Sequence, residues 1–213
     1  TRQPGGTALG AALRDLVLHG EAITPRAEAL VFAADKAQHV AEVVLPSLAR
    51  GAVVVTDRYT DSSVAYQGAG RSLGAQEVAD LQSWAVGGLT PDLTVLVDVD
   101  PATGRRRRGG THDRMESEGD GFHEAVRSHF LAMAQGSPER YLVVDGTAAP
   151  EAVADHVRAR LVADGHVRIN GKRAEAPAKG VALGDVVTVA APHGTASVRV
   201  LDLGERRGPA PEA

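Results

Sequence analysis

The chain has 213 residues, of which 43% are hydrophobic and 23% are charged, and its 23 Lys and Arg against 27 Asp and Glu give a net charge of −4. This size predicts one ordinary globular domain, or one domain with a small appendage, and the negative charge argues against a protein that wraps duplex nucleic acid. Because cysteine is absent, disulfide scaffolds and thiolate sites are excluded, and the lack of any apolar run of about 18 residues excludes a membrane span. We expect a cytoplasmic protein.

Three short apolar runs rich in β-branched residues predict buried strands at Val53 to Thr56, Leu93 to Val99 and Tyr141 to Val144. Helical spacing of apolar residues predicts helices at 7–19, 26–48, 75–86, 121–135 and 150–161. Pro46 is expected to kink or end the second of these helices, because it has no N–H to donate. Strands that alternate with helices predict an α/β fold with a parallel sheet covered on both faces.

After Leu161 the pattern changes to short alternating runs separated by turn residues, and Asn170-Gly171 indicates a tight hairpin. We therefore predict two units, an α/β domain at 1–163 and a small, mostly β unit at 164–213.

Polar residues follow the first predicted strand closely: Asp57, Arg58 and Tyr59, then Ser62, Ser63, Tyr66 and Gln67. An aspartate at a strand end can hold a metal ion through water, an arginine can fork onto a phosphate, and Tyr and Gln can grip a planar ring. The alternative is an aspartate that caps the next helix and pairs with its neighbour on the surface, and for an isolated Asp-Arg pair this alternative is favoured.

A second cluster holds four consecutive arginines, Arg105 to Arg108, followed by two glycines and then Asp113-Arg114. Such a segment suits a mobile flap that closes over phosphates, although taken alone it reads more readily as a solvated charge run. The opening TRQPGGT places Arg2 beside glycines that permit close backbone approach. Phe32 and Lys36 lie four apart on one helix face, as an aromatic platform and a cation would.

Several segments taken together resemble bacterial thymidylate kinase, in the order of that family and over about three quarters of the chain: TRQPGGT, FAADKAQHV at 32–40, DRYTDSSVAYQGAGR at 57–71, PDLTVLVDVDP at 91–101 and DRMESEGDGFHEAVRSHFLAMA at 113–134. The resemblance implies transfer of the γ-phosphoryl group of ATP to dTMP with Mg²⁺. It also implies a P-loop kinase fold with a lid, which is usually a homodimer.

The resemblance also implies roles for individual residues. Arg2 and Arg58 would hold the dTMP phosphate, Phe32 would stack on thymine, and Asp57 would join the magnesium network through water. Ser63, Tyr66 and Gln67 fall where the family contacts base and sugar, and Tyr66 would crowd a ribose hydroxyl. The lid would span 105–114, with Arg108 and Arg114 as the candidates for the arginine that meets the transferring phosphoryl group.

The sequence departs from the family at the donor side. It contains no GxxxxGK[ST], the loop that cradles the ATP phosphates, and the resemblance begins just after the place of that loop and its strand. We therefore expect a sheet without its first strand, weak dTMP binding and negligible phosphoryl transfer. Gln3 replaces the usual Glu, and Lys36 replaces the usual arginine, which keeps the charge but loses the planar fork.

The segment GHVRINGKRAEAPAKGVALGDVVTV at 165–189 resembles the later half of an S-four-type RNA-binding domain. RNA contact there would rest on Arg168, Lys172, Arg173 and Lys179. The alternative is a small β appendage with ordinary surface charges, which is slightly favoured because the unit has no aromatic residue for base stacking. For the whole chain, the rival to a kinase is a noncatalytic RNA-binding protein. A natural fusion, a fragment and an artificial join all stay open.

Overall fold

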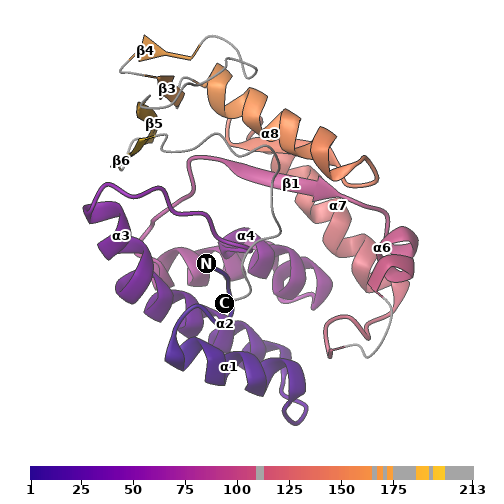
Figure 1. Cartoon of the computed structure of the whole chain (residues 1–213). Helices are drawn as coiled ribbons and strands as arrows, with labels where there is room; N and C mark the ends of the chain where they lie inside the picture. The colour runs from indigo at the N-terminus through magenta and orange to yellow at the C-terminus, as the bar shows by residue number, and fades with distance from the viewer. Residues whose placement is uncertain (109–112, 165–166, 170–171, 175–185, 192–193, 200–213) are drawn as a thin grey trace.

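The computed structural model describes residues 1–108, 113–164, 167–169, 172–174, 186–191 and 194–199 (Figure 1). The first half of the chain is helical, with α1 (Ala8–His19), α2 (Pro25–His39), η1 (Val40–Val44), α3 (Leu45–Ala49), α4 (Thr60–Ser63), η2 (Val64–Gly70) and α5 (Ala75–Ala85), where η denotes a π-helical stretch. Strands and helices then alternate as β1 (Thr94–Asp98), α6 (Pro101–Arg108), α7 (Asp120–Gly136), β2 (Tyr141–Asp145) and α8 (Pro150–Ala163). None of the helices in this described part is long and apolar enough to cross a membrane.

The long helix predicted at 26–48 is one helical run from Pro25 to Ala49 with an irregular middle. It begins at Thr24, whose side chain accepts a hydrogen bond from the Ala27 amide at 3.3 Å. Its central turn is π-helical, since the Leu45 N–H bonds back to the Val40 carbonyl. Pro46 follows directly and has no N–H for a regular helical bond, so the wider turn accommodates it without ending the helix.

Two of the three predicted strands are confirmed. The strands β1 and β2 pair in parallel, from Thr94 opposite Tyr141 to Asp98 opposite Asp145. Helix α7 contacts both strands and α8 contacts β2, as expected for crossover units that cover a parallel sheet (Figure 1).

The strand predicted at Val53 to Thr56 is wrong, because the structure gives this segment no regular strand pairing. Its neighbour among the described residues is the short stretch Thr1–Gln3: the Asp57 amide donates to the Thr1 carbonyl at 3.0 Å, and the Gln3 amide donates to the Asp57 carbonyl at 2.9 Å. A bridge of this length is too short to form a ladder. The side chains of Val53 and Val55 are accordingly 41% and 75% exposed.

Two sets of contacts hold the segment after Asp57 in place. Tyr59 is buried in an apolar cluster with Val40, Val44 and Val86, and its hydroxyl donates to the Leu89 carbonyl at 3.0 Å. In addition, Asp61 of α4 accepts hydrogen bonds from Arg140 at 2.8 Å and from the Tyr141 hydroxyl at 2.7 Å. These contacts tie α4 to the helical half and to strand β2.

Four further strands form an antiparallel sheet in the order β4-β3-β5-β6: β3 (Val167–Ile169), β4 (Lys172–Arg173), β5 (Val186–Ala191) and β6 (Gly194–Arg199). Ile169 pairs with Lys172, next to the predicted Asn170-Gly171 turn, which itself lies outside the described residues. The division of the chain at 163 into two folding units stays a prediction.

Candidate functional site

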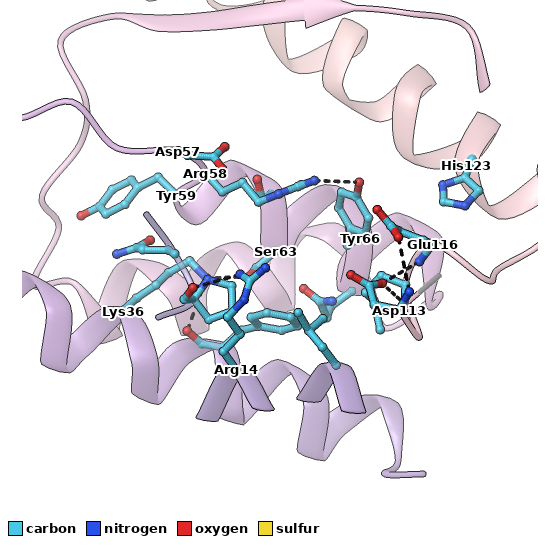
Figure 2. A pocket seen from close by; sticks show the side chains of 17 residues that line it. Arg14, Lys36, Asp57, Arg58, Tyr59, Ser63, Tyr66, Asp113, Glu116 and His123 are labelled. Atoms are coloured by element: carbon cyan, nitrogen blue, oxygen red, sulfur yellow. Dashed lines mark hydrogen bonds between the residues drawn. The ribbon is translucent and has the colours of Figure 1, made fainter. Parts of the chain in front are cut away.

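A cavity of about 330 Å³ lies between α1, α2, the segment 57–67 and the segment 113–123 (Figure 2). Most of the acceptor-site residues predicted from the sequence line it: Phe32, Lys36, Asp57, Arg58, Ser63, Tyr66 and Gln67. They come from two separate stretches of the chain, 32–36 and 57–67. The fold therefore brings them together in one cavity.

Lys36 is a buried cation in the wall of this cavity, with 3% of its surface exposed. Its Nζ donates to Ser63 Oγ at 2.9 Å and to the Phe32 carbonyl at 3.3 Å, and lies 5.4 Å from the centre of the Phe32 ring. Burial lowers the pKa of Lys36 to about 8, with Asp35 opposing the shift and Arg58 adding to it. The Lys36 ammonium group therefore loses its proton more readily than an ordinary lysine, and it lies next to the Phe32 ring.

Arg58 has a strained backbone and a directed side chain. Its φ of 65° lies in the left-handed region that long side chains rarely adopt, and the Thr56 hydroxyl donates to its carbonyl at 3.1 Å. The guanidinium carbon stands 5.0 Å from the centre of the Tyr66 ring, and Nη2 donates to the Tyr66 hydroxyl at 3.4 Å (Figure 2). Strain of this kind is typical of binding and catalytic positions.

Tyr66 joins the cavity to helix α7 through aromatic contacts. Its ring meets Phe122 edge to face at 5.9 Å and Phe130 at 6.4 Å between centroids. Gly70 allows this packing, since a Cβ there would stand 2.5 Å from the Phe122 ring. The aromatic wall is therefore fixed from both η2 and α7.

Other lining residues were not predicted as site residues. Arg14 of α1 lines the cavity and donates to the Pro4 carbonyl at 3.1 Å. Nothing in its sequence spacing distinguishes it from a surface arginine, so only the fold places it at the cavity. Asp113 and Glu116 form part of the opposite wall, where Asp113 Oδ1 accepts from the Met115 amide at 2.8 Å and the Glu116 amide at 2.9 Å.

Three predicted arginines do not line the cavity. Arg2 forms a backbone bridge with Asp57, and Arg108 ends α6. Arg114 donates to a carboxylate oxygen of Glu28 at 3.4 Å and to the Glu21 carbonyl at 3.1 Å. Their roles at phosphate stay predictions.

Within the described residues, no group of three or more His, Cys, Asp and Glu side chains is placed to hold a metal ion. Asp57 offers one exposed carboxylate at the cavity. Magnesium is commonly held by one or two carboxylates, with waters and substrate phosphates completing its shell. Asp57 therefore fits a single magnesium ligand that acts through water.

The residues predicted to contact RNA lie in or beyond the antiparallel sheet. Arg168 in β3 is the register partner of Arg173 in β4, and the Lys172 side chain is exposed. Lys179 lies outside the described residues. RNA contact by this set stays a prediction.

Comparisons with known proteins agree on one family. The profile described as Thymidylate kinase matches residues 1–157. Thymidylate kinase of Leifsonia xyli subsp. xyli is 55% identical over 171 residues, which cover 78% of this chain and 80% of that protein. The enzyme of the same name from Bifidobacterium longum is 53% identical over 158 residues, covering 72% and 77%.

A solved structure supports the same assignment. The crystal structure of thymidylate kinase from Ehrlichia chaffeensis matches with a TM-score of 0.55 and 29% identity, over 67% of this chain and 71% of that one. The matched range of the family profile includes every residue that lines the cavity, and the relatives and the solved structure carry the same family name. The chain belongs to the thymidylate kinase family.

Proposed function

We propose that the cavity binds dTMP as the acceptor of the γ-phosphoryl group of ATP, in the reaction that yields dTDP. The observation that carries this proposal is the convergence, in one cavity, of a buried lysine beside an aromatic ring and an arginine stacked on a tyrosine. A pyrimidine nucleotide offers a flat base for the first pair and an anionic phosphate for the arginine. The cavity therefore offers a partner for the base and a partner for the phosphate of the nucleotide.

We place the base of dTMP against Phe32 and Lys36 and its phosphate at Arg58, and this orientation gives each predicted residue a contact. Phe32 stacks on the base, while Lys36, Ser63 and Gln67 meet its polar edge. Arg58 binds the phosphate, with Arg2 near the same end of the ligand. Tyr66 lies along the sugar, where its ring leaves little room for a 2′-hydroxyl and so favours the deoxy nucleotide.

Fewer residues can be assigned to ATP and magnesium than to dTMP. When bound, Mg²⁺ with ATP supplies charge neutralisation for the transferring phosphoryl group, and Asp57 is the residue we assign to it. Arg108 and Arg114 are the lid arginines proposed to approach the donor. The 213 residues contain no GxxxxGK[ST], so we expect this polypeptide alone to bind dTMP weakly and to transfer phosphoryl groups negligibly.

Isothermal titration calorimetry of the full chain with dTMP, dCMP and UMP tests the binding proposal. We expect dTMP to bind more tightly than either competitor, because dCMP has the wrong base edge and UMP carries a 2′-hydroxyl. Equal affinity for all three nucleotides would show a general anion site and would contradict the proposal.

A coupled assay of dTMP-dependent ADP release tests the expectation about transfer. We expect no rate above the background measured without dTMP. Turnover at the rate of an ordinary kinase, on the order of 1 s⁻¹ or faster, would contradict that expectation while leaving the acceptor site in place.

A further inference from the structure

Glu28 in the first turn of α2 is a buried carboxylate that contacts Gln67, a residue of the cavity wall, from outside the cavity. Its surface is 2% exposed, and it does not itself line the cavity. Gln67 is 1% exposed, does line the cavity, and donates from Nε2 to Glu28 Oε1 at 2.9 Å. The two residues are 39 positions apart, so only the fold brings them together.

This contact determines which way the Gln67 amide faces. A glutamine amide has a donor end and an acceptor end that exchange when the terminal torsion turns by half a circle. A carboxylate only accepts, so Glu28 selects the orientation in which Nε2 faces it. The Oε1 atom of Gln67 accepts no hydrogen bond from the described residues, which leaves it as the acceptor that the amide can present to a ligand.

Glu28 is itself held firmly. Arg71 donates to both of its oxygens at 3.3 Å, and Arg114 donates to Oε2 at 3.4 Å. Arg71 is fixed in turn by an ion pair with Glu118 and by the Phe122 ring, whose centre lies 5.1 Å from its guanidinium carbon. The Glu28 carboxylate is therefore fixed in orientation, and it cannot rotate to adapt to a Gln67 amide that has turned over.

We propose that Glu28 is a positioning residue that locks the Gln67 amide with its acceptor toward the cavity and so selects a pyrimidine with an N–H at position 3. Thymine carries that N–H, whereas position 3 of cytosine is an acceptor. An amide free to turn would match either base. The inference rests on the proposed function, because it requires the base to lie against Gln67.

The test compares two variants that each remove one carboxylate from Arg71. In Glu28→Gln the new amide can donate or accept, so the Gln67 amide is released. In Glu118→Gln the Glu28–Gln67 hydrogen bond stays intact, which makes this variant the matched control. Affinities for dTMP and dCMP are measured by calorimetry with the full chain, after thermal unfolding has confirmed that each variant is folded.

We expect the ratio of dTMP to dCMP affinity to fall about tenfold in Glu28→Gln, the effect of one lost hydrogen-bond preference. In Glu118→Gln we expect the ratio to stay within about twofold of wild type. An unchanged ratio in Glu28→Gln, or an equal fall in both variants, would overturn the proposal, because the second result would assign discrimination to the ion pairs of Arg71.

A measurement without ligand separates this proposal from the proposed function. The two Nε2 protons of Gln67 are followed in a ¹⁵N-labelled full chain by NMR. We expect one strongly shifted, hydrogen-bonded proton in wild type and Glu118→Gln, and loss of that shift in Glu28→Gln. If wild type fails to bind dTMP, the proposed function fails, and this spectrum still decides whether Glu28 locks the amide.

Discussion

Lys36 Nζ and Ser63 Oγ lie 2.9 Å apart in the wall of the cavity, and this hydrogen bond joins α2 to α4 across 27 positions of the chain. The resemblance to the family implies an arginine where this chain has Lys36. A lysine has one compact ammonium group, and here that group is directed to a hydroxyl and a backbone carbonyl. Lys36 therefore places in the cavity wall a cation whose charge depends on pH.

The first prediction concerns the pH dependence of stability. The pKa of Lys36 is lowered by burial to about 8, from 10.5. The unfolded chain therefore binds this proton more tightly, and stability rises with pH between those values and is lost as pH falls toward 8. Between pH 7 and 9.5 the free energy of unfolding of wild type should rise by roughly 2 kcal/mol relative to Lys36→Met. Urea denaturation of both proteins measures this difference.

Subtracting the Lys36→Met curve removes the titration of all other groups. A difference that does not change with pH would mean that Lys36 keeps its ordinary pKa in the folded chain. A difference that falls with pH would contradict the sign of the shift.

The second prediction concerns Arg58 and the phosphate. Arg58→Ala removes a guanidinium held against Tyr66 while leaving the rest of the cavity unchanged. We expect dTMP affinity to fall on the order of 100-fold, since charge-assisted hydrogen bonds to the phosphate are lost. Thymidine, which has no phosphate, should lose little affinity in the same titration.

Arg50→Ala is the matched control for that prediction. Arg50 is an exposed arginine at the end of α3 that bonds to Ser47. Its removal lowers the net charge equally and should leave dTMP affinity unchanged. Equal losses in both variants would show that only the overall charge matters.

The third prediction concerns acid stability. His39 is fully buried, with Nδ1 at 2.7 Å from Gln3 Nε2 and Nε2 at 2.7 Å from Thr1 Oγ1. Burial lowers its pKa below 6.5, with Asp35 opposing the shift. The contribution of His39 to stability is therefore present above pH 6.5 and is lost as pH falls below it.

His39→Asn keeps a polar side chain but cannot titrate. We expect its free energy of unfolding to fall less than that of wild type between pH 7.5 and pH 5.5, as measured by guanidinium denaturation at each pH. Identical losses in the two proteins would show that other groups cause the acid instability. His19→Asn, on the exposed end of α1, is the control and should behave as wild type.

The fourth prediction concerns the contact that anchors α4 to the sheet. Asp61→Asn weakens the acceptor of both Arg140 and the Tyr141 hydroxyl in a half-buried setting. We expect a loss of about 2 to 3 kcal/mol in the free energy of unfolding, because a partly buried guanidinium is left without its ion pair. Thermal and chemical denaturation of wild type and Asp61→Asn both measure this loss of stability.

Asp80→Asn is the matched control for Asp61. Asp80 is an aspartate of α5 whose bond to Gln76 is exposed to solvent, so its neutralisation should cost less than about 0.5 kcal/mol. A loss at Asp61 no larger than that at Asp80 would mean that the contact to β2 does not stabilise the fold.

Much of the local structure could be predicted from the sequence. The helical run at 25–49 and the strands β1 and β2 follow from apolar periodicity and β-branched runs, which depend on residues near one another in the chain. The sequence also placed Asp57 to Gln67 close together, because they form one short stretch, whereas their role as acceptor-site residues stays a prediction. The family assignment rests on the spacing of the motifs and on the comparisons.

Only the tertiary structure decided how distant segments meet. Val53 to Thr56 has the composition of a strand, but a strand also needs a partner, and among the described residues only the short stretch Thr1–Gln3 is hydrogen-bonded beside it. Glu28 reads as an ordinary acidic residue in the first turn of a helix, where such residues are common. Its contact with Gln67 exists because the fold brings α2 into contact with η2, and the burial of both side chains then requires each to have a polar partner. Apolar periodicity in the sequence indicates which face of a helix or strand is buried. The partner of a buried charged side chain depends instead on which helices and strands the tertiary fold brings into contact.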